Sequence, residues 1–145
     1  MMRYLVVLML AAFMAQASAA TINVSKPNGK GFIDVVIIGD LKADDEKTFS
    51  EATANIPDKE KIRVVLISDG GEALAIGIGD IIRNSGMSTL VPPGRTCASA
   101  CAFIWLAGSP RFMGSEARIG FHGAAPFHQG AKTHPYPPTA TIPTT

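Results

Sequence analysis

The sequence predicts an α/β layer fold, in which buried strands alternate with helices. Two nearly continuous β-branched runs, at residues 32–38 and 62–67, are typical of strands buried on both faces. A segment with apolar residues at helical spacing follows each run. Because parallel strands need a crossover between them, this alternation favours parallel pairing within one sheet.

The first half of this pattern has recognisable start and stop signals. Residues 21–30 are polar and predict the end of a lead-in strand and a turn. Asp44 is placed to cap a helix whose apolar face includes Phe49, and Pro57 follows that helix as a stop.

The second half begins with a turn at Ser68-Asp69-Gly70-Gly71 that leads into a helix ending near Asn84. The apolar stripe of this helix consists of Leu74, Ile78, Ile81 and Ile82. The remaining segments predict a short strand, a helix of small apolar residues and two further short strands, at residues 88–91, 97–107, 111–113 and 118–121.

Residues 1–19 have the pattern of a signal peptide. Arg3 gives a basic start, residues 4–14 are uncharged and apolar, and Ala17-Ser18-Ala19 offers small residues for cleavage. A retained membrane anchor is the alternative, but spanning a bilayer takes about 20 apolar residues. We therefore expect cleavage after Ala19 and an exported, periplasmic protein that contacts the membrane during export, in an oxidising compartment.

Composition divides the remainder into a domain over residues 20–122 and a tail over residues 123–145. The tail holds five of the ten prolines, five threonines and no acidic residue, which predicts disorder and indicates a family member cut short at its C-terminus. His128 and His134 in the tail lack a nearby cysteine or carboxylate, so we expect no metal site and no cofactor. With 13 basic against 12 acidic residues and no basic stripe, nucleic acid is not an expected partner.

Three features are candidates for chemistry: a Gly-Gly turn after a buried strand, Ser99 among small residues near a helix start, and His122 after a strand. A serine hydroxyl becomes a nucleophile when a base removes its proton, and histidine is the usual base. The oxyanion that forms on attack needs N–H donors, which a Gly-Gly turn and a helix start present.

The same residues carry a family resemblance. The chain has SDGG at 68–71, CASACAF at 97–103 and RIGFH at 118–122. In this order and spacing they resemble the Clp-protease proteolytic subunit, and more closely the exported Clp-like proteins of bacteria within the Clp/crotonase superfamily. The resemblance covers residues 32–122.

This resemblance implies a fold of repeated ββα units, serine endopeptidase activity on a peptide or protein substrate, and assembly of identical subunits. Carried over by position, Ser99 is the nucleophile and His122 the general base. The backbone N–H groups of Gly71 and Ala100 form the oxyanion hole.

The chain departs from the family pattern in two places. Asp69 stands where the family typically has Pro, which puts a carboxylate beside the developing oxyanion unless it faces solvent or pairs with Arg95. No Asp or Glu follows Glu116, so the family's third catalytic residue, an acid downstream of the histidine, is absent. Because this acid orients the histidine, its absence predicts low or no activity. The first alternative is a non-catalytic domain of the same fold that binds a peptide or protein. The second is an acyl-CoA-processing relative from the crotonase branch, which works through its oxyanion hole and seldom needs Ser and His at these positions.

Cys97 and Cys101 flank Ser99. Four residues apart on one helix, their Cα atoms would lie about 6 Å apart, within the range of a disulfide. Two small buried core thiols are the alternative.

Overall fold

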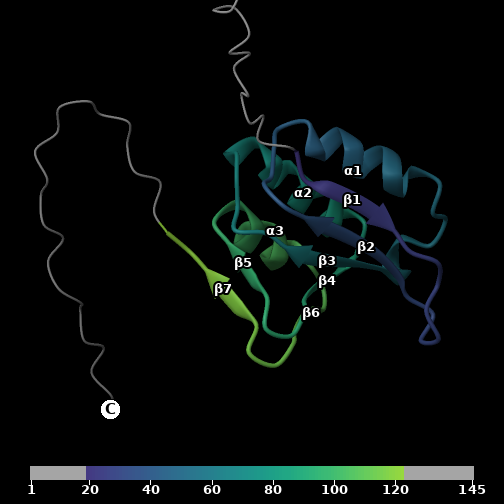
Figure 1. Cartoon of the computed structure of the whole chain (residues 1–145). Coiled ribbons are helices and arrows are strands. Elements are labelled where there is room, and N and C mark those ends of the chain that lie inside the picture. Colours follow the sequence, from purple (N-terminus) through teal and green to yellow (C-terminus); the bar gives the residue numbers. More distant parts are fainter. Residues whose placement is uncertain (1–18, 123–145) are drawn as a thin grey trace, which may run out of the picture.

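The computed structural model describes residues 19–122 (Figure 1). All but the last residue of the predicted signal peptide, and the whole predicted tail with His128 and His134, lie outside this range. The described chain contains seven strands and three α-helices: β1 (Thr21–Val24), β2 (Ile33–Ile38), α1 (Asp45–Ala54), β3 (Ile62–Ile67), α2 (Gly77–Asn84), β4 (Ser88–Val91), β5 (Thr96–Ala98), α3 (Ala100–Ala107), β6 (Arg111–Met113) and β7 (Arg118–Gly120). Short 3₁₀ turns precede β3 and α2, at Lys59–Lys61 and Ala73–Ile76.

The strands form one main sheet and one small sheet. The main sheet has the order β1-β2-β3-β4-β6, with β1 antiparallel to β2 and the other neighbours parallel. The small sheet consists of β5 and β7 in parallel and stands to one side of the main sheet in Figure 1. A bridge between Ser68 and Cys97 joins the end of β3 to β5. The predicted α/β class is confirmed.

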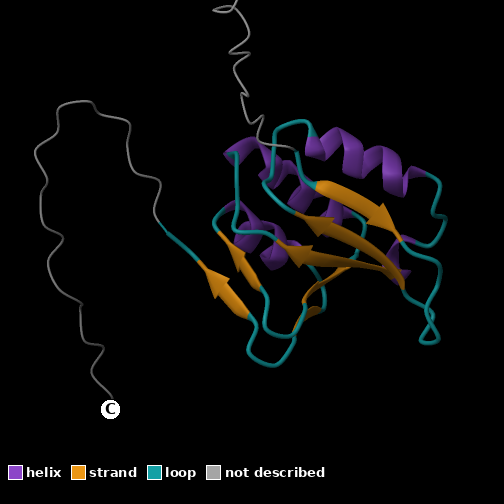
Figure 2. Ribbon diagram, in the orientation of Figure 1, coloured by secondary structure: helices purple, strands orange, loops and turns teal. Residues whose placement is uncertain are grey.

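The helices lie above and behind the strands of the main sheet in Figure 2 and form the core with it. Helix α1 contacts β1 and α2, α2 contacts α3, and α3 contacts β3, β4 and β5. The largest fully buried side chains come from both layers, and they include Ile37, Leu41, Phe49, Leu66, Ile78, Ile82 and Ile104. The helices α2 and α3 approach closely where Gly79 meets Ala107, because a Cβ at Gly79 would lie 3.4 Å from the Ala107 Cβ.

The two β-branched runs differ in burial. Along β3, four of the six residues are buried and the other two are half-buried, as expected for a strand covered on both faces. Along β2, Val35 and Ile37 are buried whereas Ile38 is 44% exposed. The prediction of two-sided burial was therefore wrong for β2. On its open face, Asp34 and Arg63 pair across the parallel register in a two-pronged ion pair.

Two helix predictions need correction. The helix expected over residues 97–107 begins only at Ala100, because residues 96–98 pair with β7 as strand β5. Leu74, expected in an apolar stripe, is 74% exposed because residues 73–76 form a 3₁₀ turn whose side chains follow a different angular spacing. At the start of α1, Asp44 makes no side-chain capping bond, and Asp45 is the buried acidic residue.

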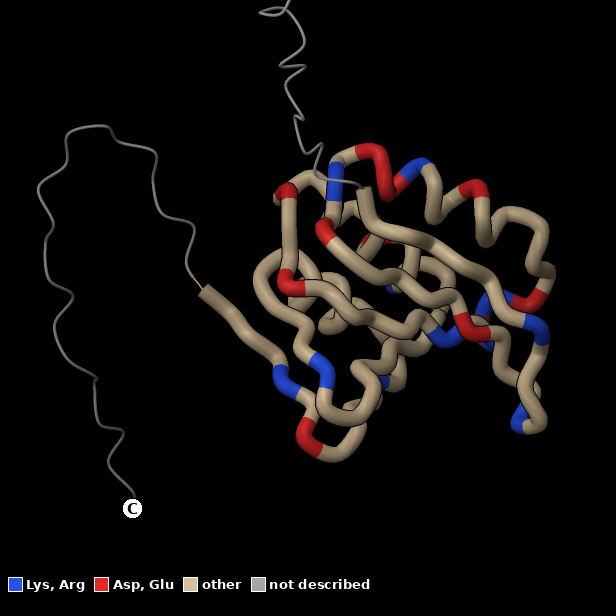
Figure 3. The backbone as a smooth tube through the Cα atoms, in the orientation of Figure 1, with Lys and Arg blue, Asp and Glu red and all other residues tan. Residues whose placement is uncertain are grey.

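Charged residues do not gather into a stripe. In Figure 3 the Lys and Arg positions are scattered along the tube and interspersed with Asp and Glu. Within residues 19–122 no helix is long and apolar enough to cross a bilayer.

Candidate active site

Ser99 occupies a sharp turn between β5 and α3. Its backbone dihedrals are φ 55° and ψ −125°, a region that residues other than glycine rarely adopt. Strained backbone of this kind costs about 1–3 kcal/mol and is concentrated at functional sites. A strand, a strained serine and a helix in direct succession form the same kind of elbow that presents the nucleophile in α/β-hydrolases.

The Gly70-Gly71 turn lies directly against this elbow. A Cβ at Gly70 would lie 2.6 Å from the Ser99 Cβ and 3.3 Å from its Oγ, so only glycine allows the approach. A Cβ at Gly71 would lie 2.1 Å from the Leu41 carbonyl oxygen. Both glycines also have positive φ, 116° and 150°. The turn therefore requires glycine at both positions, because a side chain at Gly71 would collide with the Leu41 backbone and one at Gly70 would collide with Ser99.

Ser68 connects the Gly70-Gly71 turn to the strand that leads into the elbow. Its buried hydroxyl accepts the Gly70 N–H and donates to the Gly70 carbonyl, each at 3.1 Å. Its backbone N–H donates to the Thr96 carbonyl, and its carbonyl accepts the Ala98 N–H. Ser68 was expected only as part of the turn, and the one sequence signal for its holding role is a hydroxyl at the end of a buried strand.

Two N–H groups beside the elbow remain available to a ligand. Among the described residues, neither the Gly71 N–H nor the Ala100 N–H donates a hydrogen bond. The Gly70 N–H, by contrast, donates to Ser68. These are the two donors that the family resemblance assigned to the oxyanion hole.

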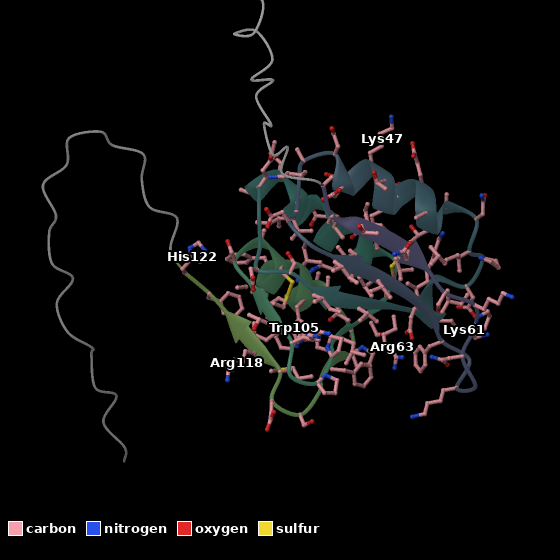
Figure 4. All side chains as sticks on the ribbon, in the orientation of Figure 1. Lys47, Lys61, Arg63, Trp105, Arg118 and His122 are labelled. Atoms are coloured by element: carbon pink, nitrogen blue, oxygen red, sulfur yellow. A yellow bond between two sulfur atoms is a disulfide. The ribbon has the colours of Figure 1, made fainter. Side chains whose placement is uncertain are left out.

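His122 follows β7 and is exposed, at the end of the described chain (Figure 4). The Ser99 N–H donates to the Gly120 carbonyl at 2.8 Å, so the end of β7 lies beside the elbow. His122 comes two residues after Gly120, and two residues of extended chain span at most about 7 Å. The backbone therefore brings the candidate base into the neighbourhood of the candidate nucleophile.

Asp69 is exposed at the rim of an open hollow of about 350 Å³. The walls of this hollow come from the ends of β2 and β3 and from the start of β5, and Asp40 and Arg95 also line it. Among the described residues, no ion pair joins Arg95 to Asp69 or Asp40. The Asp69 carboxylate is thus in contact with solvent, which weakens its repulsion of a neighbouring anion.

Cys97 and Cys101 are joined in a disulfide, with their Cα atoms 5.2 Å apart (Figure 4). The two cysteines do not share a helix as assumed from the sequence, since Cys97 lies in β5 and Cys101 in α3. Both are fully buried. The bond therefore ties together the strand and the helix on either side of Ser99.

Two exposed aromatic side chains lie on the segments that adjoin the elbow. Phe103 and Phe121 pack edge to face with ring centroids 5.6 Å apart, and they are 45% and 53% exposed. Phe103 is one helical turn after Ser99, and Phe121 lies between Gly120 and His122. No group of three or more potential metal ligands occurs within residues 19–122.

Comparison with known structures identifies the fold. The crystal structure of a candidate enoyl-CoA hydratase from Streptomyces avermitilis is similar to this chain, with a TM-score of 0.51, 13% sequence identity, and coverage of 72% of this chain and 50% of that one. An enoyl-CoA hydratase from Geobacillus kaustophilus HTA426 gives a TM-score of 0.48 at 18% identity, over 71% and 52% of the two chains. The chain has the crotonase-like fold. No protein-family model and no curated protein matches it.

This crotonase-like chain spans about half the length of the structures it resembles. At such low identity the likeness establishes the fold, and fold alone does not assign an activity. It does not distinguish a peptidase from another enzyme or a binding protein with this fold. The chemistry must therefore be argued from Ser99 and its surroundings.

Proposed function

We propose that this crotonase-like protein is a serine hydrolase that cleaves peptide bonds, with Ser99 as nucleophile and His122 as general base. The observation that carries the proposal is the strained Ser99 elbow, pressed against the Gly70-Gly71 turn. Glycine adopts this φ without cost, so the serine carries a backbone strain that a residue with only a connecting role could avoid.

The proposed reaction begins when His122 removes the proton of the Ser99 hydroxyl and the oxygen attacks the substrate carbonyl. The carbonyl oxygen gains negative charge, and we assign the N–H groups of Gly71 and Ala100 as the donors that stabilise it. Each such donor contributes about 3–4 kcal/mol to the transition state in known hydrolases. The Ala100 N–H also lies at the start of α3, where the helix dipole favours an anion.

Phe103 and Phe121 support a substrate with an apolar side chain next to the reacting carbonyl. Their exposed rings lie near the elbow and present aromatic surface that is not buried in the core. Burying apolar surface stabilises a complex by roughly 25 cal/mol per Å². We therefore infer a peptide or protein substrate with an apolar residue at that position.

The test is covalent labelling of the folded protein by a fluorophosphonate probe, which reacts with activated serines. We expect labelling at Ser99, at a rate set by how readily His122 takes up the serine proton. Ser99→Ala should abolish labelling and His122→Ala should reduce it strongly. Mass spectrometry of the labelled peptide identifies the serine.

Each outcome decides the proposal. Labelling that persists in Ser99→Ala would show that another residue is the nucleophile. A folded protein that is never labelled would favour the non-catalytic alternative, a domain that binds peptides on the surface formed by Phe103 and Phe121. Ser109→Ala is the matched control, since Ser109 is exposed just after the C-terminal end of α3, whereas Ser99 precedes its start, and this variant should label as the unaltered protein does.

A further inference from the structure

A carboxylate is buried at the start of α1. Asp45 is 2% exposed, and its Oδ2 accepts the Lys42 N–H at 2.7 Å and the Ala20 N–H at 3.3 Å. Among the described residues, no Lys, Arg or His side chain forms an ion pair with this carboxylate. A buried negative charge is costly unless a positive charge accompanies it. Two backbone amides satisfy the hydrogen bonds of Asp45 but do not neutralise its charge.

The second donor stands at a special position in the sequence. Ala20 directly follows Ala17-Ser18-Ala19, the small residues expected at a signal-peptidase site. In the uncleaved chain the Ala20 nitrogen is an uncharged amide that donates one hydrogen to Asp45. Cleavage after Ala19 would convert that same nitrogen into the chain's N-terminal amine.

We propose that cleavage of the Ala19–Ala20 bond creates an N-terminal ammonium that forms an ion pair with the buried Asp45. Water supplies the hydroxyl group of the new Ala19 carboxylic acid, and Ala20 keeps its nitrogen and takes up protons to become an ammonium. An α-amino group is mostly charged at pH 7. Charge-assisted bonds of this kind are shorter and stronger than amide bonds, with nitrogen–oxygen distances of about 2.7–2.9 Å.

We place processing before folding. Ala20 is 9% exposed and belongs to the hydrophobic core, whereas Ala19 is exposed, so the Ala20 nitrogen becomes buried beside Asp45 only when the chain folds. A signal peptide is removed while the chain is being exported, when it is still unfolded. The ion pair is therefore a product of maturation that the folding chain incorporates.

The ion pair would also support the candidate active site. Lys42, which donates to Asp45, follows Leu41, and the Leu41 N–H donates to the Gly70 carbonyl at 2.9 Å. The Leu41 carbonyl in turn accepts the Glu72 N–H at 2.8 Å. The Gly70-Gly71 turn is thus held by the segment that Asp45 anchors. This second consequence rests on the proposed function, whereas the ion pair does not.

The experiment compares proteins that differ at the N-terminus. The first begins at Ala20 with a free amine, the second is the same chain acetylated at Ala20, and the third begins at Ala19. Acetylation restores an uncharged amide at the same position, so it is the matched control for charge. We expect the free Ala20 chain to melt about 5 °C or more above the other two, the shift expected from roughly 1 kcal/mol in a domain of this size.

Asp45→Asn keeps the shape and an acceptor oxygen but removes the charge. In this variant the three N-terminal forms should melt at the same temperature. Equal melting of the three unaltered forms, or a difference that persists in Asp45→Asn, would overturn the proposal. So would an exported full-length chain whose N-terminus, read by mass spectrometry, is not Ala20.

Fluorophosphonate labelling of the same proteins separates the two consequences. If the ion pair supports the oxyanion turn, the free Ala20 chain should label several-fold faster than the acetylated chain. Melting differences without any labelling would leave the ion pair established and refute the proposed hydrolase activity. Labelling at equal rates would refute the coupling between Asp45 and the Gly70-Gly71 turn.

Discussion

Gly70→Ala tests the contact that defines the candidate site. The new methyl group would lie 2.6 Å from the Ser99 Cβ and 3.0 Å from the Ala98 carbonyl oxygen, whereas ordinary contacts begin at 3.4 Å. Either the turn or the elbow must therefore move by about 0.8 Å. A displacement of about 1 Å between reacting groups can reduce a rate about 100-fold. We expect fluorophosphonate labelling of Ser99 to fall by that order.

The same substitution also costs stability, in two separable parts. Alanine at a φ of 116° adds about 1–3 kcal/mol of backbone strain. Overpacking against Ser99 adds about 1–3 kcal/mol more. In a Ser99→Gly background the Ser99 Cβ is gone, so most of the second part should disappear while the first part remains.

Urea unfolding of the four chains in this double-mutant cycle measures the coupling. We expect Gly70→Ala to cost about 1–3 kcal/mol less in the Ser99→Gly background than in the unaltered protein. Gly86→Ala is the control for positive φ, since its Cβ would meet Glu60 at 3.4 Å, far along the chain from the elbow. Additive effects, together with unchanged labelling in Gly70→Ala, would refute the contact between the turn and the serine.

Three further substitutions or treatments probe the elbow. Ser99→Gly should raise the free energy of unfolding by about 1 kcal/mol, because the relief of backbone strain exceeds the added entropy of the unfolded chain. The same variant should not be labelled, and a lower melting temperature would contradict the claim that Ser99 is strained. Asp69→Asn should speed labelling by about twofold to fivefold, the size expected for an exposed carboxylate near a developing anion; slower labelling would show that the carboxylate helps. Refolding in a reductant should leave Cys97 and Cys101 as thiols and slow the labelling of Ser99 several-fold. If alkylation finds two free thiols in the folded protein under oxidising conditions, the disulfide between these cysteines is rejected.

The sequence determined the sheet and its order of elements. The boundaries of β3 and β4 follow from their β-branched and apolar residues, which fit a pleated and largely buried surface. The α/β class follows from the alternation of such strands with helices, since each apolar strand face must be covered by another layer. The glycine pair and Ser99 were also recognisable, because a tight turn and a helix start require particular residue types.

The tertiary structure decided what these residues do to one another. Residues 96–98 are small and apolar and fit a helix as well as a strand, and pairing with β7 makes them a strand. Ser99 follows this strand directly, and its N–H donates to the Gly120 carbonyl, so a contact between segments distant in sequence accompanies its strained turn. Likewise, Asp45 and Ala20 are 25 residues apart, and only the packing of α1 beside β1 places the carboxylate at that nitrogen. Local propensities specify elements, whereas strain and buried charges arise where elements meet.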